Sequence, residues 1–339
     1  MSKPVSAPTR TPDDPPDADR AAKIAAVRRG LLRWFAANAR DLPWRRTRDP
    51  YRVLVSEVML QQTQVERVIP YYETFLERFP TVQALASAPT SAVIQSWAGL
   101  GYNRRAVNLQ RTARAVVKEH EGAFPRSVKE LQKLPGIGPY TAGAIACFAF
   151  EQDTPFIDTN MRRVLHRWFF GVDVPQPFAS DRQLLAVAAA TLPPGDGWRW
   201  NQALIEFGAL QCTARKPACV VCPLQAECAA FPAIQGVIQT LPPGVRRKQE
   251  APFAGSQRYF RGRVVAALRE LDSAEHAAGL SLAELGPRVK PSFADADLAW
   301  LRTLVRDLER DGLAAIAEDA PAYDATNPEP SPELRVRLP

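Results

Sequence analysis

The sequence predicts an all-α fold followed by a small C-terminal α+β module, and three observations support this. First, apolar residues such as Ile24, Val27 and Leu31 recur at helical spacing across 21–39. Second, residues 51–150 form helical segments separated by prolines and glycines, without the alternation of a strand. Third, the C-terminal stretch contains three more helical segments and then two short β-like pieces.

Residues that break helices separate the predicted elements, for example Pro80, Pro89 and Gly122. Gly312 stands where the last predicted helix should stop. Three helices and a two-stranded ribbon are the outline of a winged helix, a module that commonly contacts duplex DNA. The predicted helices cover 21–39, 52–62, 64–78, 81–87, 90–98, 104–120, 127–134, 139–150, 160–170, 180–191, 198–210, 258–271, 281–289 and 296–311, and the strands 313–316 and 334–338.

The composition indicates two or three compact domains and a polyanionic partner. The chain has 339 residues, of which 46% are apolar and 23% charged. Its net charge of +7 favours polyanions, because Lys and Arg neutralise phosphates and release counterions. No apolar run is long enough to cross a bilayer, and the N-terminus lacks the apolar core of a signal peptide. We therefore expect a cytoplasmic protein with a disordered tail over residues 1–20.

Four of the five cysteines fall within 17 residues, namely Cys212, Cys219, Cys222 and Cys228. Such clustering, without a secretion signal, favours metal binding over disulfides. The spacing C-x6-C-x2-C-x5-C lets one loop surround a compact centre, and soft thiolates select zinc or an iron–sulfur cluster. Structural zinc is the alternative, although zinc ribbons usually have two separated C-x2-C pairs. Cys147 lies in an apolar helix and is expected in the core.

Residues 134–145, LPGIGPYTAGAI, indicate a helix-hairpin-helix that binds DNA backbone. Gly136 and Gly138 allow positive φ and close approach of a ligand, and the amides that open the next helix suit an anion. A dinucleotide site is excluded because Thr141 replaces the third glycine and no strand precedes the motif. A purely structural turn between helices remains the alternative.

Two acidic residues are candidates for glycoside chemistry. Glu57 has Val53, Leu54 and Leu60 as helical neighbours, and a carboxyl among apolar groups holds a proton near neutrality. Asp158 precedes a helix, where it could face a developing sugar cation. The alternatives are a surface or salt-bridged glutamate for Glu57 and a simple helix cap for Asp158.

Together, these features resemble the MutY family of adenine DNA glycosylases, within the helix-hairpin-helix superfamily that includes endonuclease III. The resemblance covers about residues 25–232 and implies a six-helix barrel domain, an iron–sulfur helical domain and a 4Fe–4S cluster on the four clustered cysteines. The matching motifs are Leu42-Pro43-Trp44-Arg45, SEVMLQQTQV over 56–65, Gly99-Leu100-Gly101-Tyr102, the 134–145 hairpin, Ile157-Asp158, Asn201-Gln202-Ala203-Leu204 and the four cysteines.

The resemblance implies catalytic roles for three residues. Glu57 matches the acid that protonates N7 of the flipped adenine and later handles water. Asp158 matches the carboxylate that stabilises the oxocarbenium ion. Tyr140 occupies a position that is lysine in bifunctional relatives, where it forms a Schiff base with the sugar. Because a phenol cannot do this, little or no β-lyase activity is expected.

Four further residues match positions that bind DNA in the family. Arg45 and Gln202 resemble residues around the adenine pocket. Gln62 and Tyr102 resemble residues that enter the duplex beside the mispair, which offsets the cost of flipping a nucleotide. The alternatives are a surface salt bridge or solvated helix face for Arg45 and Gln202, and a core aromatic for Tyr102.

The sequence also departs from the family pattern. Thr159-Asn160 follows the aspartate where glycine and asparagine are commoner, Asn103 replaces a second tyrosine, and Leu54 replaces a frequent tryptophan. Many members carry a Nudix-like domain that checks for 8-oxoguanine through a Phe-Ser-His loop, which is absent here. Discrimination of the opposite base is therefore the part that the resemblance supports least.

The function predicted is removal of adenine opposite 8-oxoguanine or guanine in double-stranded DNA, by a bacterial enzyme acting as a monomer. One alternative is a thymine or uracil mismatch glycosylase of the same fold, and another is a non-catalytic iron–sulfur DNA-binding protein. Motifs of serine hydrolases and P-loop proteins are absent. The predicted domains are the tail at 1–20, a discontinuous iron–sulfur domain at 21–50 and 155–235, the six-helix barrel at 51–154, a linker at 236–254 and the winged-helix-like module at 255–339.

Overall fold

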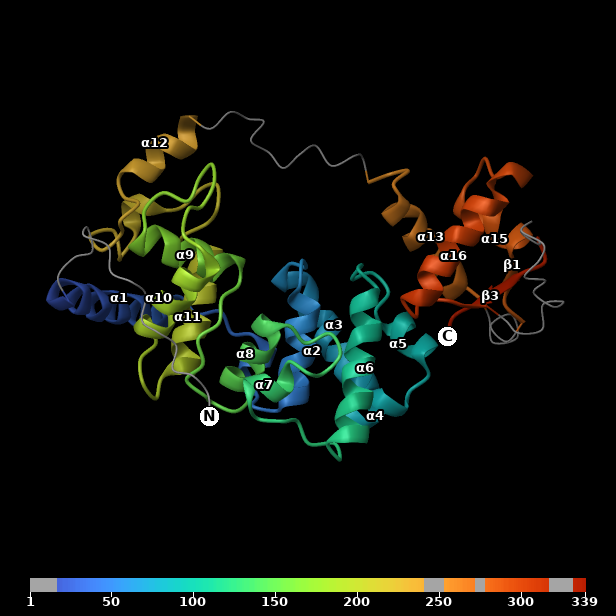
Figure 1. The fold of residues 1–339 in the computed structure, drawn as a ribbon, viewed down its shortest axis with the longest axis horizontal. Helices are drawn as coiled ribbons and strands as arrows, with labels where there is room; N and C mark the ends of the chain where they lie inside the picture. Colours follow the sequence, from blue (N-terminus) through green and yellow to red (C-terminus); the bar gives the residue numbers. More distant parts are fainter. Residues whose placement is uncertain (1–16, 241–252, 272–277, 317–331) are drawn as a thin grey trace. The chain divides into compact units, whose positions relative to one another are not determined.

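The computed structural model describes residues 17–240, 253–271, 278–316 and 332–339. These residues are mostly helical, which confirms the predicted fold class (Figure 1). The chain divides into two compact units, and the three-domain division expected from the sequence stays a prediction. The first unit comprises Met1–Val53, Arg126–Gln132 and Ile137–Lys248, and the second comprises Leu54–Pro125, Lys133–Gly136 and Gln249–Pro339.

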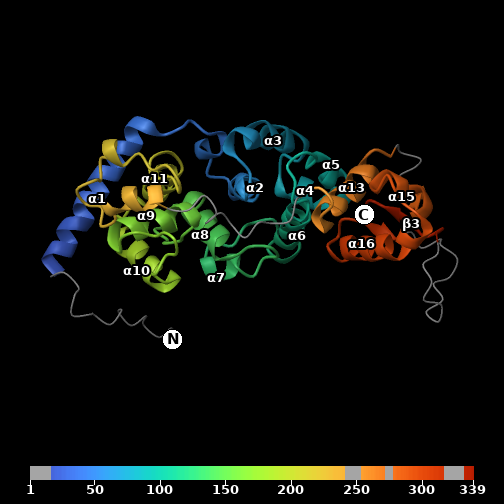
Figure 2. The ribbon, with the colours of Figure 1, turned by 90° about the horizontal axis from the view of Figure 1, so that it is seen from above.

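The first unit is a bundle in which α1, α9, α10 and α11 lie side by side (Figures 1 and 2). Its core is aromatic: Phe207 contacts Trp34 edge to face at 4.9 Å between ring centroids and Trp168 at 5.3 Å. The elements are α1 (Asp17–Asn38), η1 (Pro43–Arg46), α7 (Val128–Leu131), α8 (Pro139–Phe148), α9 (Thr159–Phe169), α10 (Asp181–Thr191), α11 (Gly197–Leu210), η2 (Cys219–Val221) and α12 (Ala233–Thr240).

The second unit begins within α2 and is organised around α6 (Arg104–Glu119). The buried Gln110 amide of α6 donates to the carbonyls of Leu85 at 3.1 Å and Ala88 at 2.7 Å, which fixes α4 against it. Its other helices before the hairpin are α2 (Pro50–Leu60), α3 (Val65–Arg78), α4 (Val82–Ser87) and α5 (Thr90–Ser96).

The C-terminal module belongs to the second unit, and its described residues include three helices of eight or more residues and a small antiparallel sheet (Figure 1). The sheet order is β1-β3-β2, with Val336 paired to both Leu280 and Ile316. The predicted two-stranded ribbon therefore lacks one strand of the sheet. This third strand precedes α15 and has two residues, too few to show an alternation of apolar and polar residues in the sequence. The elements are α13 (Gln257–Arg269), β1 (Leu280–Ser281), α15 (Leu282–Val289), η3 (Asp295–Asp297), α16 (Leu298–Arg310), β2 (Ala315–Ile316) and β3 (Arg335–Arg337).

Two predicted boundaries differ from the structure. α1 begins at Asp17, so residues 17–20 are helical where a tail was expected, and the rest of that tail lies outside the described residues. α12 continues to Thr240, so the predicted linker starts in a helix, and residues 241–252 also lie outside the described part. No helix within the described residues has the length and apolarity to cross a membrane.

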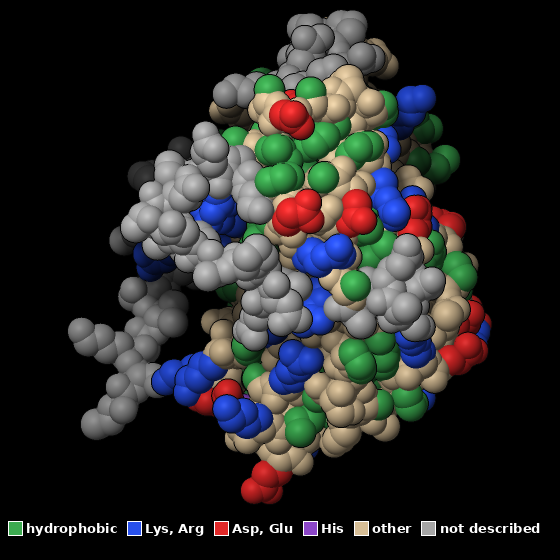
Figure 3. Space-filling view, turned by 90° about the vertical axis from the view of Figure 1, so that its right-hand side faces the viewer, with side chains coloured by type: hydrophobic (Ala, Val, Ile, Leu, Met, Phe, Trp, Pro, Cys, Tyr) green, Lys and Arg blue, Asp and Glu red, His purple; other side chains and the backbone are tan. Residues whose placement is uncertain are grey.

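Figure 3 shows one face of the molecule, on which Lys and Arg side chains are distributed among acidic and hydrophobic ones. The positive net charge is therefore not gathered into a single patch on this face.

Candidate active site and iron–sulfur loop

Glu57 is a buried carboxyl on α2. The residue is 6% exposed, and its helical neighbours Val53 and Leu54 are buried. The alternative of a surface glutamate is therefore wrong. Burial disfavours the charged form of a carboxyl unless hydrogen bonds or opposite charges compensate for it.

Asp158 is the N-cap of α9. Its Oδ1 accepts a hydrogen bond from the Met161 amide at 2.6 Å. Burial raises the pKa of the Asp158 carboxyl, although the Met161 amide and the charge of Arg163 act in the opposite direction. The alternative of a helix cap is thus confirmed for one carboxylate oxygen, and the catalytic role stays a prediction.

Tyr140 lies in the same unit as Asp158 and packs against the segment that leads to it. The Tyr140 ring meets Phe156 edge to face, with centroids 5.5 Å apart. Gly143 on α8 permits this approach, because a Cβ there would lie 2.7 Å from the Phe156 Cβ. The sequence analysis missed Gly143, whose signal is a glycine inside an otherwise apolar helix.

Arg45 and Gln202 are brought together by a buried network. Arg45 Nε donates to Gln202 Oε1 at 2.8 Å, and Arg45 Nη2 donates to Glu206 Oε2 at 3.0 Å. Arg40 Nη2 also donates to Glu206 Oε2, at 2.8 Å. The Gln202 side chain is buried, so the alternatives of a solvated face and a surface salt bridge are wrong.

Glu206 was missed by the sequence analysis, although it lies one turn after Gln202 on the same helix. Burial alone would raise the pKa of its fully buried carboxyl. Hydrogen bonds from Arg40 and Arg45 outweigh burial and lower that pKa to about 2. Glu206 is therefore an anion that orients Arg45, and through it Gln202.

Gln62 and Tyr102 have left-handed backbone conformations, with φ of 57° and 47°. Each costs about 1 kcal/mol, which the surrounding structure must offset. Tyr102 is 48% exposed, so the alternative of a core aromatic is wrong. Tyr102 also lines a cavity of ≈ 540 Å³ between α6 and α13, together with Arg104 and Arg261.

The hairpin between α7 and α8 confirms only part of the prediction for its glycines. Gly136 has φ of 80°, whereas Gly138 has φ of −86° and serves as the extended N-cap of α8. A positive φ at Gly138 was therefore a wrong expectation. The turn is held by Thr112, whose hydroxyl donates to the Pro135 carbonyl at 2.6 Å.

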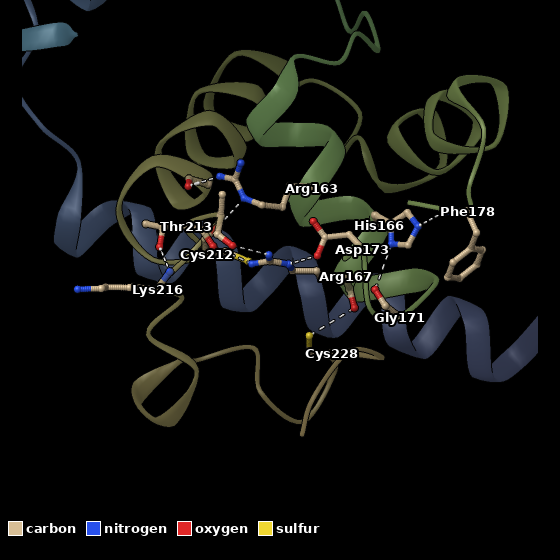
Figure 4. Close-up of polar contacts among 12 residues, drawn as sticks. Arg163, His166, Arg167, Gly171, Asp173, Phe178, Cys212, Thr213, Lys216 and Cys228 are labelled. Carbon is tan, nitrogen blue, oxygen red and sulfur yellow. Dashed lines mark hydrogen bonds and ion pairs between the residues drawn. The ribbon is translucent and has the colours of Figure 1, made fainter. Parts of the chain in front are cut away.

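The cysteine loop follows α11 and is tied to α9 by arginines (Figure 4). Arg167 Nη1 donates to Cys212 Sγ at 3.5 Å and to the Thr213 carbonyl at 2.8 Å. Arg163 Nε donates to the Cys212 carbonyl at 2.8 Å, and the Cys228 thiol donates to the Arg167 carbonyl at 3.4 Å. Two guanidinium groups therefore lie beside the thiols, where they would offset negative charge on a thiolate-ligated centre.

The four thiols are close enough to influence one another electrostatically. Burial, together with the charges of Cys212, Cys228 and Cys219, raises the pKa of the Cys222 thiol to about 11. Thiols in such surroundings ionise when a metal centre supplies positive charge. An all-thiolate donor set in one loop fits an iron–sulfur cluster. Cys147 is separate from them, fully buried in α8, which confirms the core prediction.

Comparison with known proteins agrees with this geometry. Residues 55–188 match the HhH-GPD superfamily of base excision DNA repair proteins, and residues 212–228 match the iron–sulfur binding domain of endonuclease III. Adenine DNA glycosylase of Mycolicibacterium smegmatis is 44% identical over 246 residues, which cover 71% of this chain and 79% of that protein. This chain belongs to the adenine DNA glycosylase family. The iron–sulfur cofactor is thereby confirmed over zinc.

Other members of the family cover this chain to different extents. Adenine DNA glycosylase of Mycobacterium tuberculosis is 39% identical over 299 residues, which cover 85% of this chain and 88% of that protein. The human adenine DNA glycosylase is 46% identical over 219 residues, or 62% of this chain and 40% of the human protein. Glu57 and Asp158 lie within the region that matches the HhH-GPD superfamily, and the four cysteines within the region that matches the iron–sulfur binding domain.

Solved structures confirm the fold. A thermostable thymine-DNA glycosylase is 30% identical with a TM-score of 0.59, over 62% of this chain and 98% of its own. An endonuclease III trapped on DNA is 24% identical with a TM-score of 0.53, over 63% of this chain and 96% of its own. Each of these structures therefore matches less than two thirds of this chain.

We predict that Glu206→Gln lowers the free energy of unfolding by about 3 kcal/mol, because two guanidinium groups lose a buried anion. Since the pKa is lowered to about 2, the stabilisation is present above the unfolded-state pKa and is lost as pH falls through about 2. Urea unfolding between about pH 2 and about pH 7 measures both effects. Equal stability of the variant and the parent at neutral pH would contradict the assignment.

Proposed function

We propose that this chain excises adenine mispaired with 8-oxoguanine or guanine in double-stranded DNA, acting as a cytoplasmic monomer without significant β-lyase activity. The observation that carries the proposal is the burial of Glu57 in α2, within the family motif. Departure of a purine is assisted by protonation at N7, and a buried carboxyl can deliver that proton at neutral pH. The family membership and the hairpin support DNA as the substrate.

The chemistry follows from the two carboxyl groups. Glu57 gives its proton to N7 as the bond between the sugar C1′ and the base N9 breaks, and the bonding electrons leave with the neutral base. The Asp158 carboxylate stabilises the positive charge on the sugar. A water molecule then adds to C1′ and passes a proton to the Glu57 carboxylate, which leaves an abasic site and restores the acid.

The remaining site residues position the substrate. Arg45 and Gln202, joined at 2.8 Å, line the adenine pocket, while Gln62 and Tyr102 enter the duplex. Tyr140 packs beside the Asp158 segment and lacks the amine that a Schiff base requires.

The hairpin glycines and the four clustered cysteines have supporting roles. Gly136 and Gly138 bring the hairpin backbone to a phosphate. Cys212, Cys219, Cys222 and Cys228 would hold the iron–sulfur cluster, which would cross-link their loop.

Thymine is the second candidate base, because the thermostable thymine-DNA glycosylase has a TM-score of 0.59 and 30% identity with this chain. Single-turnover assays on matched duplexes separate the two. We expect excision of adenine from A:8-oxoG and A:G duplexes at least tenfold faster than thymine from T:G, consistent with discrimination built on hydrogen-bonding groups. Faster release of thymine, or strand cleavage without alkali, would overturn the assignment.

We predict that Glu57→Gln slows single-turnover release of adenine by about 100-fold or more, because amides cannot donate a proton to N7. Duplex affinity should stay within about threefold, since the change is isosteric and removes an interaction made in the transition state. Gel-shift titration alongside the kinetics measures both. A parallel loss of duplex affinity, or an unchanged rate of adenine release, would assign Glu57 to another role. A non-catalytic DNA-binding protein would release no adenine in either the parent or the variant form.

The raised pKa of Asp158 predicts an acid limb in the pH dependence of base release. Only the carboxylate stabilises the sugar cation, and burial raises its pKa, so activity falls on acidification before an exposed aspartate, near pH 4, would protonate. Single-turnover rates across a pH series test this. Asp158→Asn, slow at every pH, should lack that limb, and a limb that persists in this variant would assign it to a different group.

A further inference from the structure

Arg105, near the start of α6, is the only residue described here that binds the loops of both Gln62 and Tyr102 through its guanidinium group. Its Nη1 donates to the carbonyls of Val58 at 2.8 Å, Met59 at 2.9 Å and Gln61 at 2.6 Å. These carbonyls end α2 or follow it, so α2 has no amides of its own to satisfy them. The positive charge is also favourable at the negative end of the α2 dipole.

The second nitrogen of Arg105 completes the link between the loops. Nη2 donates to Thr63 Oγ1 at 3.1 Å and to the carbonyls of Leu100 at 3.3 Å and Gly101 at 3.2 Å. One guanidinium group thus holds the residues on both sides of Gln62 and the residue immediately before Tyr102. Five donors in a rigid planar fork allow arginine, but not lysine, to make this many directed contacts.

Aromatic rings enclose the same group. The Arg105 guanidinium carbon lies 5.4 Å from the Trp97 ring centroid and 5.6 Å from that of Tyr102. The Trp97 indole donates to the Gly101 carbonyl at 3.2 Å, so the backbone before Tyr102 is held twice. Burial lowers the pKa of Arg105 to about 10, which leaves it charged at neutral pH.

We propose that Arg105 is a positioning residue that keeps the Gln62 and Tyr102 loops in their left-handed conformations, so that both side chains are presented to the duplex as one rigid wedge. This inference rests on the proposed function, because that function places both side chains in DNA. The unfavourable φ at each residue is what makes such a support necessary. Without it, each loop can relax, and opening the mispair is no longer concerted.

Arg114 offers a matched control on the same helix. Its Nε donates to the Ala86 carbonyl at 3.1 Å, and its Nη2 to the Thr90 hydroxyl at 3.2 Å. Arg114 therefore also ties α6 to backbone of another segment, but one that carries neither Gln62 nor Tyr102. A general loss of packing would affect both variants, whereas loss of the wedge would affect one.

The experiment uses the full chain and a duplex with 2-aminopurine in place of the target adenine, whose fluorescence rises when the base leaves the stack. Arg105→Gln should lose most of this rise and slow adenine release by about 100-fold, since misplacement by about 1 Å costs this much. Arg105→Lys should be intermediate, about tenfold slow, because it keeps the charge without the fork. Arg114→Gln should keep the parent's fluorescence rise.

A normal fluorescence rise in Arg105→Gln, or an equal loss in Arg114→Gln at matched thermal stability, would overturn the proposal. If Arg105→Gln does not fold, Arg105→Lys decides, and a full rise in that variant overturns it. Failure of the parent chain to release adenine from any duplex counts against the proposed function instead. The fluorescence rise is scored before base release and separates these two failures.

Discussion

The candidate site depends on hydrogen bonds from buried and half-buried arginine side chains to backbone carbonyls. Loops that approach DNA cannot satisfy their carbonyls in regular secondary structure, and unpaired carbonyls are costly once water is excluded. Arg105 supplies donors to the loops of the second unit, and Arg163 and Arg167 supply them to the cysteine loop. Each of these arginines lies on a packed helix, so its hydrogen bonds hold the loop against a rigid element.

Motif residues could be placed from the sequence because their types are constrained locally. A carboxyl among apolar helical neighbours predicted the burial of Glu57, and cysteine spacing predicted the cluster loop. Glu206 and Arg105 could not be predicted in the same way, because their partners are distant in the sequence. The partners of Glu206 lie 161 or more residues away, and the end of α2 that Arg105 contacts lies 42 or more residues away. No periodicity within a helix records a partner at that separation.

Local conformations were predicted less well than elements. Gly138 was expected at positive φ, but its place as an N-cap requires extended backbone instead. The strand β1 is defined by pairing of Leu280 with Val336, which lie far apart in the chain. The C-terminal module shares an apolar core with Ile94 and Val107, so it is integrated with α5 and α6 of the second unit rather than tethered to them.

Asp158 has a proposed role in catalysis and an observed role as the N-cap of α9. The same carboxyl that would face the sugar begins α9, and α9 carries Arg163 and Arg167 to the cysteine loop. A substitution at residue 158 that removes the cap would therefore be expected to disturb α9 and the cysteine loop as well as any role of the carboxylate in catalysis. Such a variant would be expected to lose protein abundance together with repair activity.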